Sequence, residues 1–445
     1  LSMSNEADRV LGGGVGSFRM LSYLGRIIYD YDGKYLITAS LRRDGVSRFA
    51  PSRRFGTFPS FSAAWKVNED FLQNIPQISL LKLRFGWGAT GNSNIGDFQY
   101  DDFLDNTSAF APVFGNPQKL VPGMYIFYSF ANPAIKWESA YMTNFGLDFG
   151  LLNNQLQGSI EYYIKNQEDL LVRVPISMVF GRSGDQSEPW ANAGKLQNRG
   201  VEMNLSYRKS TGRFTYSVSG NLTTIKNEVK YLPQKELVTG NNITYPGHTI
   251  GSLYGWIAER IITPDDFDSN GNYLYALPSS GKPSPGDLKF KDLNHDGTIN
   301  DLDKTIIGKP WPDVVLGLSF DCSYKGFDFS VFFNSMLNYD VFNAQRAGLS
   351  SFNSQDLNHN KLLDYALNYY RPDKPSTEYV RADINNSNIN DRISTWWIEK
   401  ASFLRCRDVQ FGYSLPSAFI GKAGISRTRI YLSAMNLFTI TKYTG

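Results

Sequence analysis

Hydrophobic and polar residues alternate along many stretches of about ten residues in this chain. In residues 214–223, for example, Val218 and Leu222 lie at even positions, whereas every odd position carries Ser, Thr or Asn. Residues 35–42 and 201–208 alternate in the same way. Because successive side chains of a β-strand point to opposite faces, each segment predicts a strand with one apolar and one polar face. About ten residues is also the length that a tilted strand needs to cross a bilayer.

The pattern predicts about twelve such strands, most of them arranged in pairs. Short turn signals such as Asp32-Gly33 and Lys325-Gly326 join the two members of a pair and favour tight hairpins. The predicted strands are residues 21–29, 35–42, 58–67, 81–89, 145–151, 156–164, 201–208, 214–223, 314–324, 327–333, 403–415 and 429–438.

Between the hairpins the connections are long, and the pattern predicts no regular elements in them. They cover residues 90–138, 173–197, 226–312 and 336–400. Alternation of short and long connections places all the long ones at one end of the sheet, as in an outer-membrane barrel with long extracellular loops. The sequence therefore predicts an all-β fold, a transmembrane antiparallel β-barrel. It has no repeat of fixed period, which argues against propellers and solenoids.

One predicted strand breaks the alternation. Leu404 and Cys406 lie at even positions, but Phe411 and Tyr413 lie at odd ones. An extra residue near Arg407 would restore a single apolar face, so we expect a β-bulge there. The alternative is a strand that faces the lipid less cleanly.

Composition narrows the class of protein further. Aromatic residues make up 14% of the chain, which agrees with the aromatic girdles of membrane barrels. The net charge of +3 is too small to indicate binding to nucleic acid. No run of about eighteen apolar residues predicts a helical membrane span. The residues from Leu1 to Glu6 do not resemble a signal peptide, so we expect a processed or truncated chain.

The sharpest local motif is a candidate calcium loop at residues 292–303. Gly297 stands where the sharp turn of such a loop is needed. Position twelve carries Asp instead of Glu, which weakens the match. The expected ligands are Asp292, Asn294, Asp296, the backbone carbonyl of Thr298, Asn300 and Asp303. We expect the Ca²⁺ ion to be structural, ordering an insert at residues 287–308 within an extracellular loop.

A solvated turn rich in Asp and Asn explains the same residues without an ion. A second acidic stretch, at residues 265–271, has Asp266, Asp268 and Asn270 at the same early spacing. It has no acid at position twelve, so we predict a plain turn there.

Tryptophans in predicted loops or at strand ends are candidate substrate contacts, because indole faces stack on sugar rings. Anchoring at the membrane interface and packing within loops are the alternative roles. These residues are Trp137, Trp190, Trp256, Trp311, Trp396 and Trp397. No Ser–His–Asp arrangement is apparent, and the three histidines have no partner at metal-ligand spacing. We therefore expect that the chain is not an enzyme.

A series of short motifs runs in order along nearly the whole chain. They are DGVSRF at 44–49, RFGTFPS at 54–60, GATGN at 88–92, NPAIKWE at 132–138, NRGVE at 198–202, GDLK at 286–289 and NLF at 436–438. Taken together and in this order, they resemble the SusC/RagA type of TonB-dependent transporter from the bacterial outer membrane.

The resemblance implies a barrel of about 22 strands filled by an N-terminal plug. It also implies a SusD-like surface lipoprotein as a lid, and uptake driven by the TonB complex through an N-terminal segment. The plug and the first barrel strands are absent from residues 1–445, and about twelve strands cannot close such a barrel in lipid. We therefore expect the chain to be the C-terminal part of the receptor barrel.

Three functions stay open at this point. The first is import of a large nutrient across the outer membrane, with an oligosaccharide as the first candidate and a peptide as the second. The next is a passive porin-like or adhesive outer-membrane barrel. The third is a secreted soluble β-protein that binds glycans, which would not need detergent for extraction.

Overall fold

The computed structural model describes residues 18–101, 103–105, 113–114, 119–120, 126–174, 188–279, 281–351, 360–416 and 424–444. Two compact units divide the chain. Unit 1 comprises Leu1–Trp65, Phe85–Thr143 and Lys165–Lys195, and unit 2 comprises Lys66–Arg84, Asn144–Ile164 and Leu196–Gly445. Among the described residues, no helix is both long enough and apolar enough to cross a membrane.

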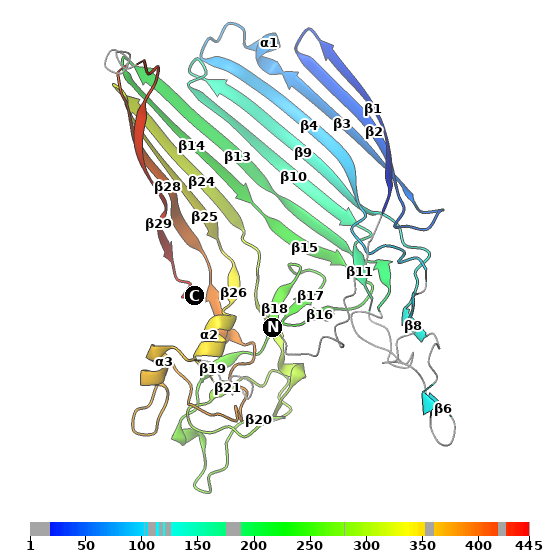
Figure 1. Ribbon diagram of the computed structural model, residues 1–445, viewed down its shortest axis with the longest axis vertical. Coiled ribbons are helices and arrows are strands. Elements are labelled where there is room, and N and C mark those ends of the chain that lie inside the picture. Colours follow the sequence, from blue (N-terminus) through cyan, green and yellow to red (C-terminus); the bar gives the residue numbers. More distant parts are fainter. Residues whose placement is uncertain are drawn as a thin grey trace. The chain divides into compact units, whose positions relative to one another are not determined.

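A sheet of 13 strands dominates the fold (Figure 1). Strand β15 (Lys226–Tyr231) pairs with β13, and the other strands form one path. In order along that path they are β1 (Met20–Tyr31), β2 (Tyr35–Val46), β3 (Phe55–Lys66), β4 (Ile78–Asn92), β9 (Glu138–Leu151), β10 (Leu156–Glu168), β13 (Lys195–Thr211), β14 (Phe214–Thr224), β24 (Val314–Tyr324), β25 (Phe327–Leu337), β28 (Phe403–Ser414) and β29 (Arg429–Thr441).

Every strand on this path corresponds to one that the alternation predicts, so the all-β antiparallel fold is confirmed. Several strands are longer than predicted. The segment expected at residues 201–208 extends over Lys195–Thr211, because backbone pairing continues beyond the residues that alternate in polarity.

Strand pairing in unit 2 keeps the two faces of the sheet distinct. In the β14–β24 ladder, Val218 lies opposite Phe320, while the neighbouring Ser219 lies opposite Ser319. Apolar side chains therefore meet across the strands on one face, and hydroxyl groups meet on the other. Leu318, on the apolar face, is 50% exposed. An extended apolar face left open in this way suits contact with hydrocarbon.

Tight turns in unit 2 lie at one end of these strands and long connections at the other (Figure 1). At the β24–β25 turn, Lys325 and Gly326 both have positive φ, 46° and 93°, and Tyr324 lies opposite Phe327. A two-residue hairpin turn of this type needs positive φ at both central positions, which glycine accepts without strain.

The bulge expected near Arg407 is confirmed. The pairing of β28 with both neighbours shifts between Cys406 and Asp408, so Arg407 has no partner on either strand. Leu404 and Phe411 lie on opposite sides of the bulge and are 42% and 51% exposed. The extra residue thus turns both side chains outward.

In unit 2 the long connections are not structureless, contrary to the expectation from the pattern. A second sheet orders β16, β17, β18 and β23, and smaller pairs surround it. The elements are β16 (Leu237–Thr239), β17 (Asn242–Thr244), β18 (Ser252–Gly255), β19 (Ala258–Ile261), η4 (Pro264–Asp266), β20 (Leu277–Pro278), β21 (Leu288–Phe290), β22 (Thr298–Ile299), η5 (Asp301–Asp303), β23 (Thr305–Gly308), β26 (Asp340–Phe342), α2 (Ala344–Leu349), α3 (Leu363–Asn368), η6 (Thr395–Trp397) and β27 (Ile398–Lys400). A core that includes Leu288, Ile299 and Tyr365 holds these loops together. Helix α1 (Val67–Phe71) links β3 to β4.

Unit 1 has a second core, built largely from the sequence motifs. Phe49, Phe58 and Trp137 come from three different motifs, and the ring centre of Trp137 lies 5.7 Å from that of Phe49 and 5.4 Å from that of Phe58. The indole Nε1 of Trp137 donates to the carbonyl of Arg54 at 2.8 Å. The remaining strands are β5 (Phe103–Asp105), β6 (Val113–Phe114), β7 (Lys119–Leu120), β8 (Ile126–Ser129), β11 (Leu171–Arg173) and β12 (Trp190–Asn192).

Arginine placed at either of two adjacent positions of β24 tests which face of the strand contacts lipid. Leu318→Arg should destabilise the folded barrel in lipid by about 2–4 kcal/mol, because a guanidinium on the lipid face loses its hydration. Ser319→Arg should have little effect, because its side chain lies on the polar face. Urea titration of the full-length protein in lipid vesicles measures both. Equal losses for the two variants would contradict this assignment of faces.

Candidate functional site

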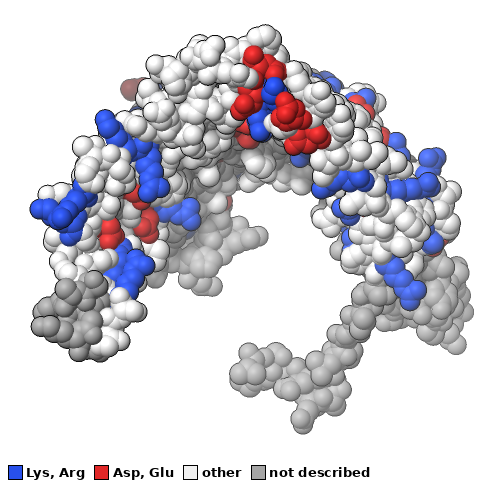
Figure 2. Space-filling view, turned by 90° about the horizontal axis from the view of Figure 1, so that it is seen from above, with Lys and Arg blue, Asp and Glu red and all other residues white. Residues whose placement is uncertain are grey.

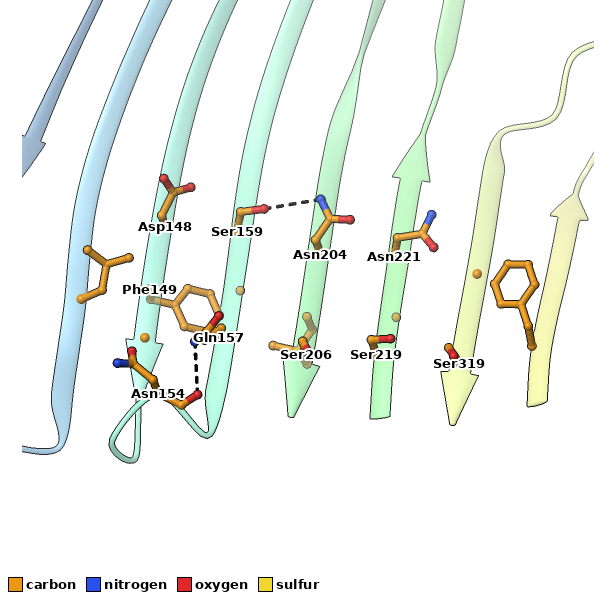
Figure 3. A pocket seen from close by; sticks show the side chains of 17 residues that line it. Asp148, Phe149, Asn154, Gln157, Ser159, Asn204, Ser206, Ser219, Asn221 and Ser319 are labelled. Carbon is orange, nitrogen blue, oxygen red and sulfur yellow. Dashed lines mark hydrogen bonds between the residues drawn. The ribbon is translucent and has the colours of Figure 1, made fainter. Parts of the chain in front are cut away.

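Small polar side chains line a hollow on one face of the unit 2 sheet. They come from five strands, β9, β10, β13, β14 and β24, and from the turn between β9 and β10, and the hollow has a volume of about 650 Å³. Figure 3 shows these side chains projecting from neighbouring strands toward the same space. The labelled polar residues are Asp148, Asn154, Gln157, Ser159, Asn204, Ser206, Ser219, Asn221 and Ser319.

Two hydrogen bonds join the side chains drawn in Figure 3 to other residues of the hollow. Asn204 Nδ2 donates to Ser159 Oγ at 3.4 Å, and Gln157 Nε2 donates to the Asn154 carbonyl at 3.3 Å (Figure 3). Amides and hydroxyls can both donate and accept hydrogen bonds. The surface can therefore bind hydroxyl or peptide groups without a charged anchor.

An ion-pair network borders the hollow. Arg84 on β4 lies between two carboxylates, with Nε 3.0 Å from Asp148 Oδ1 and Nη1 3.0 Å from Glu161 Oε2. Lys82 Nζ is 3.4 Å from the other oxygen of Asp148, and Asn144 Nδ2 donates to Glu161 at 2.6 Å. Two cations and two anions therefore balance, and the network fixes three neighbouring strands without leaving a net charge.

Charged residues elsewhere are also grouped by opposite sign. Figure 2 shows Lys and Arg side chains gathered beside Asp and Glu in several places, with wide areas of uncharged residues between them.

The two candidate tryptophans of unit 1, Trp137 and Trp190, pack in or against its core. Trp137 is buried in the core with Phe49 and Phe58. Trp190 on β12 packs against the same core, and the guanidinium of Arg173 lies 5.4 Å from its ring centre. A role in substrate contact stays a prediction for both.

The tryptophans of unit 2 differ in exposure. Trp397 is fully buried, with Nε1 donating to the Asn390 carbonyl at 2.8 Å. Trp256 and Trp396 pack against the loop core. Trp311 is 52% exposed, so of these four it has the most open ring for a ligand.

Arg392 is held in the loop core by aromatic rings. Its guanidinium lies 4.9 Å from the ring centre of Trp256 and 4.6 Å from that of Phe290. Burial lowers the pKa of Arg392 to about 10. The carbonyls of Asn388 and Ile389 accept its hydrogen bonds, so the side chain fastens residues 388–392 to the core.

The predicted calcium loop is closed by its own backbone hydrogen bonds. Asp292 accepts from the amides of His295 and Gly297 at 2.7 and 2.9 Å. Asp303 is fully buried and accepts from the amides of Leu293 and Asn300, both at 2.8 Å. Asn294 and Asp296 likewise accept from amides two residues ahead, and Asn300 accepts from the amide of Leu302.

The carboxylates of this loop do not converge on one point. Within the part of the chain that the structure describes, no three His, Cys, Asp or Glu side chains form a group suited to a metal ion. Three of the six predicted ligands are carboxylates, and the other three are two amide oxygens and one backbone carbonyl. Calcium binding therefore stays a prediction.

A buried ion pair joins the two longest loops. Asp287 is fully buried, and its Oδ1 accepts from Arg381 Nε at 2.7 Å and from Asn390 Nδ2 at 2.8 Å. Its other oxygen accepts from the Ser284 amide at 2.8 Å. Burial raises the pKa of Asp287 above its ordinary value, while Arg381 opposes that shift. The pair links residues 94 positions apart in sequence.

Sequence reasoning did not identify the hollow or the Asp287–Arg381 pair. The hollow could have been found by collecting the polar positions of all the alternating strands. Asp287 belongs to the GDLK motif at 286–289. That motif contributes to the family resemblance but does not by itself indicate a buried ion pair. Nothing in the sequence indicates its distant partner Arg381.

Comparisons with known proteins agree with this geometry. The family model described as "TonB dependent receptor-like, beta-barrel" matches residues 22–334. TonB-dependent receptor P3 of Formosa agariphila is 32% identical over 100% of this chain and 44% of its own length. TonB-dependent receptor SusC of Bacteroides thetaiotaomicron is also 32% identical, over 96% of this chain and 41% of its own length.

A solved structure is similar to the whole sheet and its loops. The RagAB peptide importer in its "closed-closed" state is 25% identical, with a TM-score of 0.75, over 95% of this chain and 44% of that one. The chain therefore spans less than half the length of the relatives it matches.

Removal of Arg381 should weaken the loops in a pH-dependent way. Arg381→Met leaves Asp287 buried without a cation, which should cost about 3–5 kcal/mol at neutral pH. The folded state would then hold a proton on Asp287 more tightly than the unfolded state, whose pKa is about 3.9. Stability should therefore be recovered as the pH falls toward about 4 and lost as it rises. Thermal unfolding and protease resistance across this range measure the effect.

Arg371→Met is the matched control. Arg371 lies in the same loop, but its ion pair is long, at 3.9 Å, and its partner Asp373 is exposed to solvent. It should cause a small loss without the pH dependence. A pH-independent loss in Arg381→Met would show that Asp287 does not carry the effect.

Calcium should stabilise the predicted loop. Addition of Ca²⁺ to chelator-treated full-length protein should release heat and raise stability by about 2.7 kcal/mol when the ion is at about 100 times its dissociation constant. Asp292→Asn should remove the response. Asp268→Asn, in the plain acidic turn, should leave it unchanged. The absence of both heat and stabilisation would exclude the ion.

Proposed function

Because this chain belongs to the TonB-dependent receptor β-barrel family, we propose that it is part of a transporter that imports a large nutrient. Barrels of this family are outer-membrane proteins, so the expected location is confirmed. The family is one of receptors and not of enzymes, which also agrees with the sequence analysis.

One observation supports transport most directly, namely the contrast between the two faces of the same strands. On β24, Leu316 and Leu318 line an apolar groove, while Gly317 and Ser319 line the polar hollow. An apolar outer face and a polar inner face are what a barrel with a wet interior requires. We propose that the hollow belongs to the wall of the import channel.

An oligosaccharide is the first candidate substrate and a peptide the second. Hydroxyl and amide groups supply all the polar side chains of the hollow except Asp148, which is its one ionisable lining residue among those described. Such a surface suits sugar hydroxyls, which need many weak and reversible hydrogen bonds. The similarity to a peptide importer supports the second candidate, because peptide groups use the same donors and acceptors.

The proposed partners follow from family membership. A SusD-like lipoprotein would cover the loop end as a lid, and the TonB complex would drive release through a part of the protein outside residues 1–445. The relatives are more than twice as long as this chain, which supports a barrel completed by further strands and filled by a plug.

A native mass measurement tests the assembly. The complex should be extracted from its own outer membrane in mild detergent. We expect a subunit about twice the size of this chain, with a second, lipidated chain attached. Cells that lack the subunit should lose uptake of the oligosaccharide, and cells without TonB should lose it equally. Uptake that survives loss of TonB, together with ungated conductance, would favour a passive porin instead.

A further inference from the structure

A cavity of about 1120 Å³ lies beside the loop end of β13 in unit 2. Arg199 and Lys226 both line it, together with Tyr162, Val201 and Val314. Arg199 lies near the start of β13, and Lys226 is the first residue of β15, which pairs with that strand. The cavity therefore lies where the long strands meet the loops.

The acids around this cavity already have cationic partners. Glu228 pairs with Lys230 at 2.6 Å, and it also lies near enough to Lys226 and Arg199 to interact with their charges. Asp340 pairs with Lys400 at 2.7 Å, and Asp313 pairs with Lys309.

Arg199 and Lys226, in contrast, form no ion pair with any residue in the described ranges. Two like charges that line one cavity repel each other unless an anion lies between them. Glu228 carries one negative charge near three cations, Lys230, Lys226 and Arg199, so two positive charges around the cavity stay unbalanced and available for a ligand.

An apolar groove continues from the cavity along the same side of the sheet. It has a volume of about 830 Å³ and is lined by Met203, Leu222, Leu316 and Leu318, among others. Val201 and Val314 in the cavity lie two residues before Met203 and Leu316, which places each pair on the same face of its strand. Gly220 has no side chain and leaves this groove open.

We propose that this surface binds a phosphorylated lipid of the outer leaflet. Its phosphate would lie against Arg199 and Lys226, and an acyl chain would occupy the groove. Four residues separate Arg199 from Met203, a rise of about 13 Å along a strand. That distance reaches from the headgroup layer into the hydrocarbon.

Charge and apolarity together favour a lipid over a free anion. A free phosphate would use the two cations but not the groove, and an uncharged lipid would use the groove but not the cations. In barrels of this family the loop end faces the outside, so the lipid is one of the outer leaflet. Bound there, it would fix the position of the strands in the membrane below the loops.

The test uses the full-length protein after removal of lipid in detergent, with monophosphorylated lipid A as the probe. Native mass spectrometry measures the bound fraction. The double variant Arg199→Gln/Lys226→Gln should bind the probe about thirtyfold more weakly, because each cation near an anionic headgroup strengthens binding about fivefold. The control, Arg208→Gln/Lys209→Gln, removes two exposed cations near the opposite end of the same strand and should bind normally.

Gly220→Leu tests the groove separately. A Cβ at this position meets the Gly317 carbonyl at 3.5 Å and Leu318 Cδ1 at 3.7 Å, which are ordinary contacts, so the barrel should fold. Its heat-dependent shift on a gel checks this. The variant should bind the probe more weakly while both cations remain.

Three results would overturn the proposal. The first is equal binding of lipid A whose phosphate has been removed. The second is unchanged binding by the double cation variant. The third is inorganic phosphate competing fully while Gly220→Leu has no effect, which would assign the cavity to a free anion.

Discussion

Strands that cross hydrocarbon must pair every backbone polar group within the sheet, because lipid offers no hydrogen bonds. That constraint fixes each strand against its neighbours, and with it the side to which each side chain points. The ladder of β14 and β24 shows the result, since Val218 meets Phe320 and Ser219 meets Ser319. The polar hollow and the apolar groove are the two sides of this one ladder.

The same constraint explains how the sheet tolerates an extra residue. At Arg407, pairing with both neighbouring strands is interrupted and then resumes; Arg407 alone is skipped opposite β25, whereas Asn436 and Leu437 of β29 are skipped as well. One unpaired residue shifts the alternation by one, and Leu404 and Phe411 consequently both face outward. Without the bulge, half of β28 would turn apolar side chains toward the polar face.

Beyond the membrane, the loops solve a different problem. They need internal cores, because long connections carry many backbone groups and lose much conformational entropy on folding. Apolar residues supply part of each core, and buried polar pairs fix which segments meet. Asp287 makes two such links in unit 2, to Arg381 at a separation of 94 positions and to Asn390 at a separation of 103. Glu399 plays a similar part by accepting from Asn343, Arg346 and the amide of Thr444.

The sequence by itself determined the strands, the tight turns, the bulge at Arg407 and the division into an apolar and a polar face. All of these depend on neighbours in sequence, through the period of two and the φ preferences of turn residues such as Gly326. Tertiary structure alone decided which polar positions gather around one hollow, that Trp397 is buried while Trp311 is open, and that Arg381 is the partner of Asp287. The physical reason is that these contacts join residues far apart in the chain, and local alternation carries no information about which distant segments pack together.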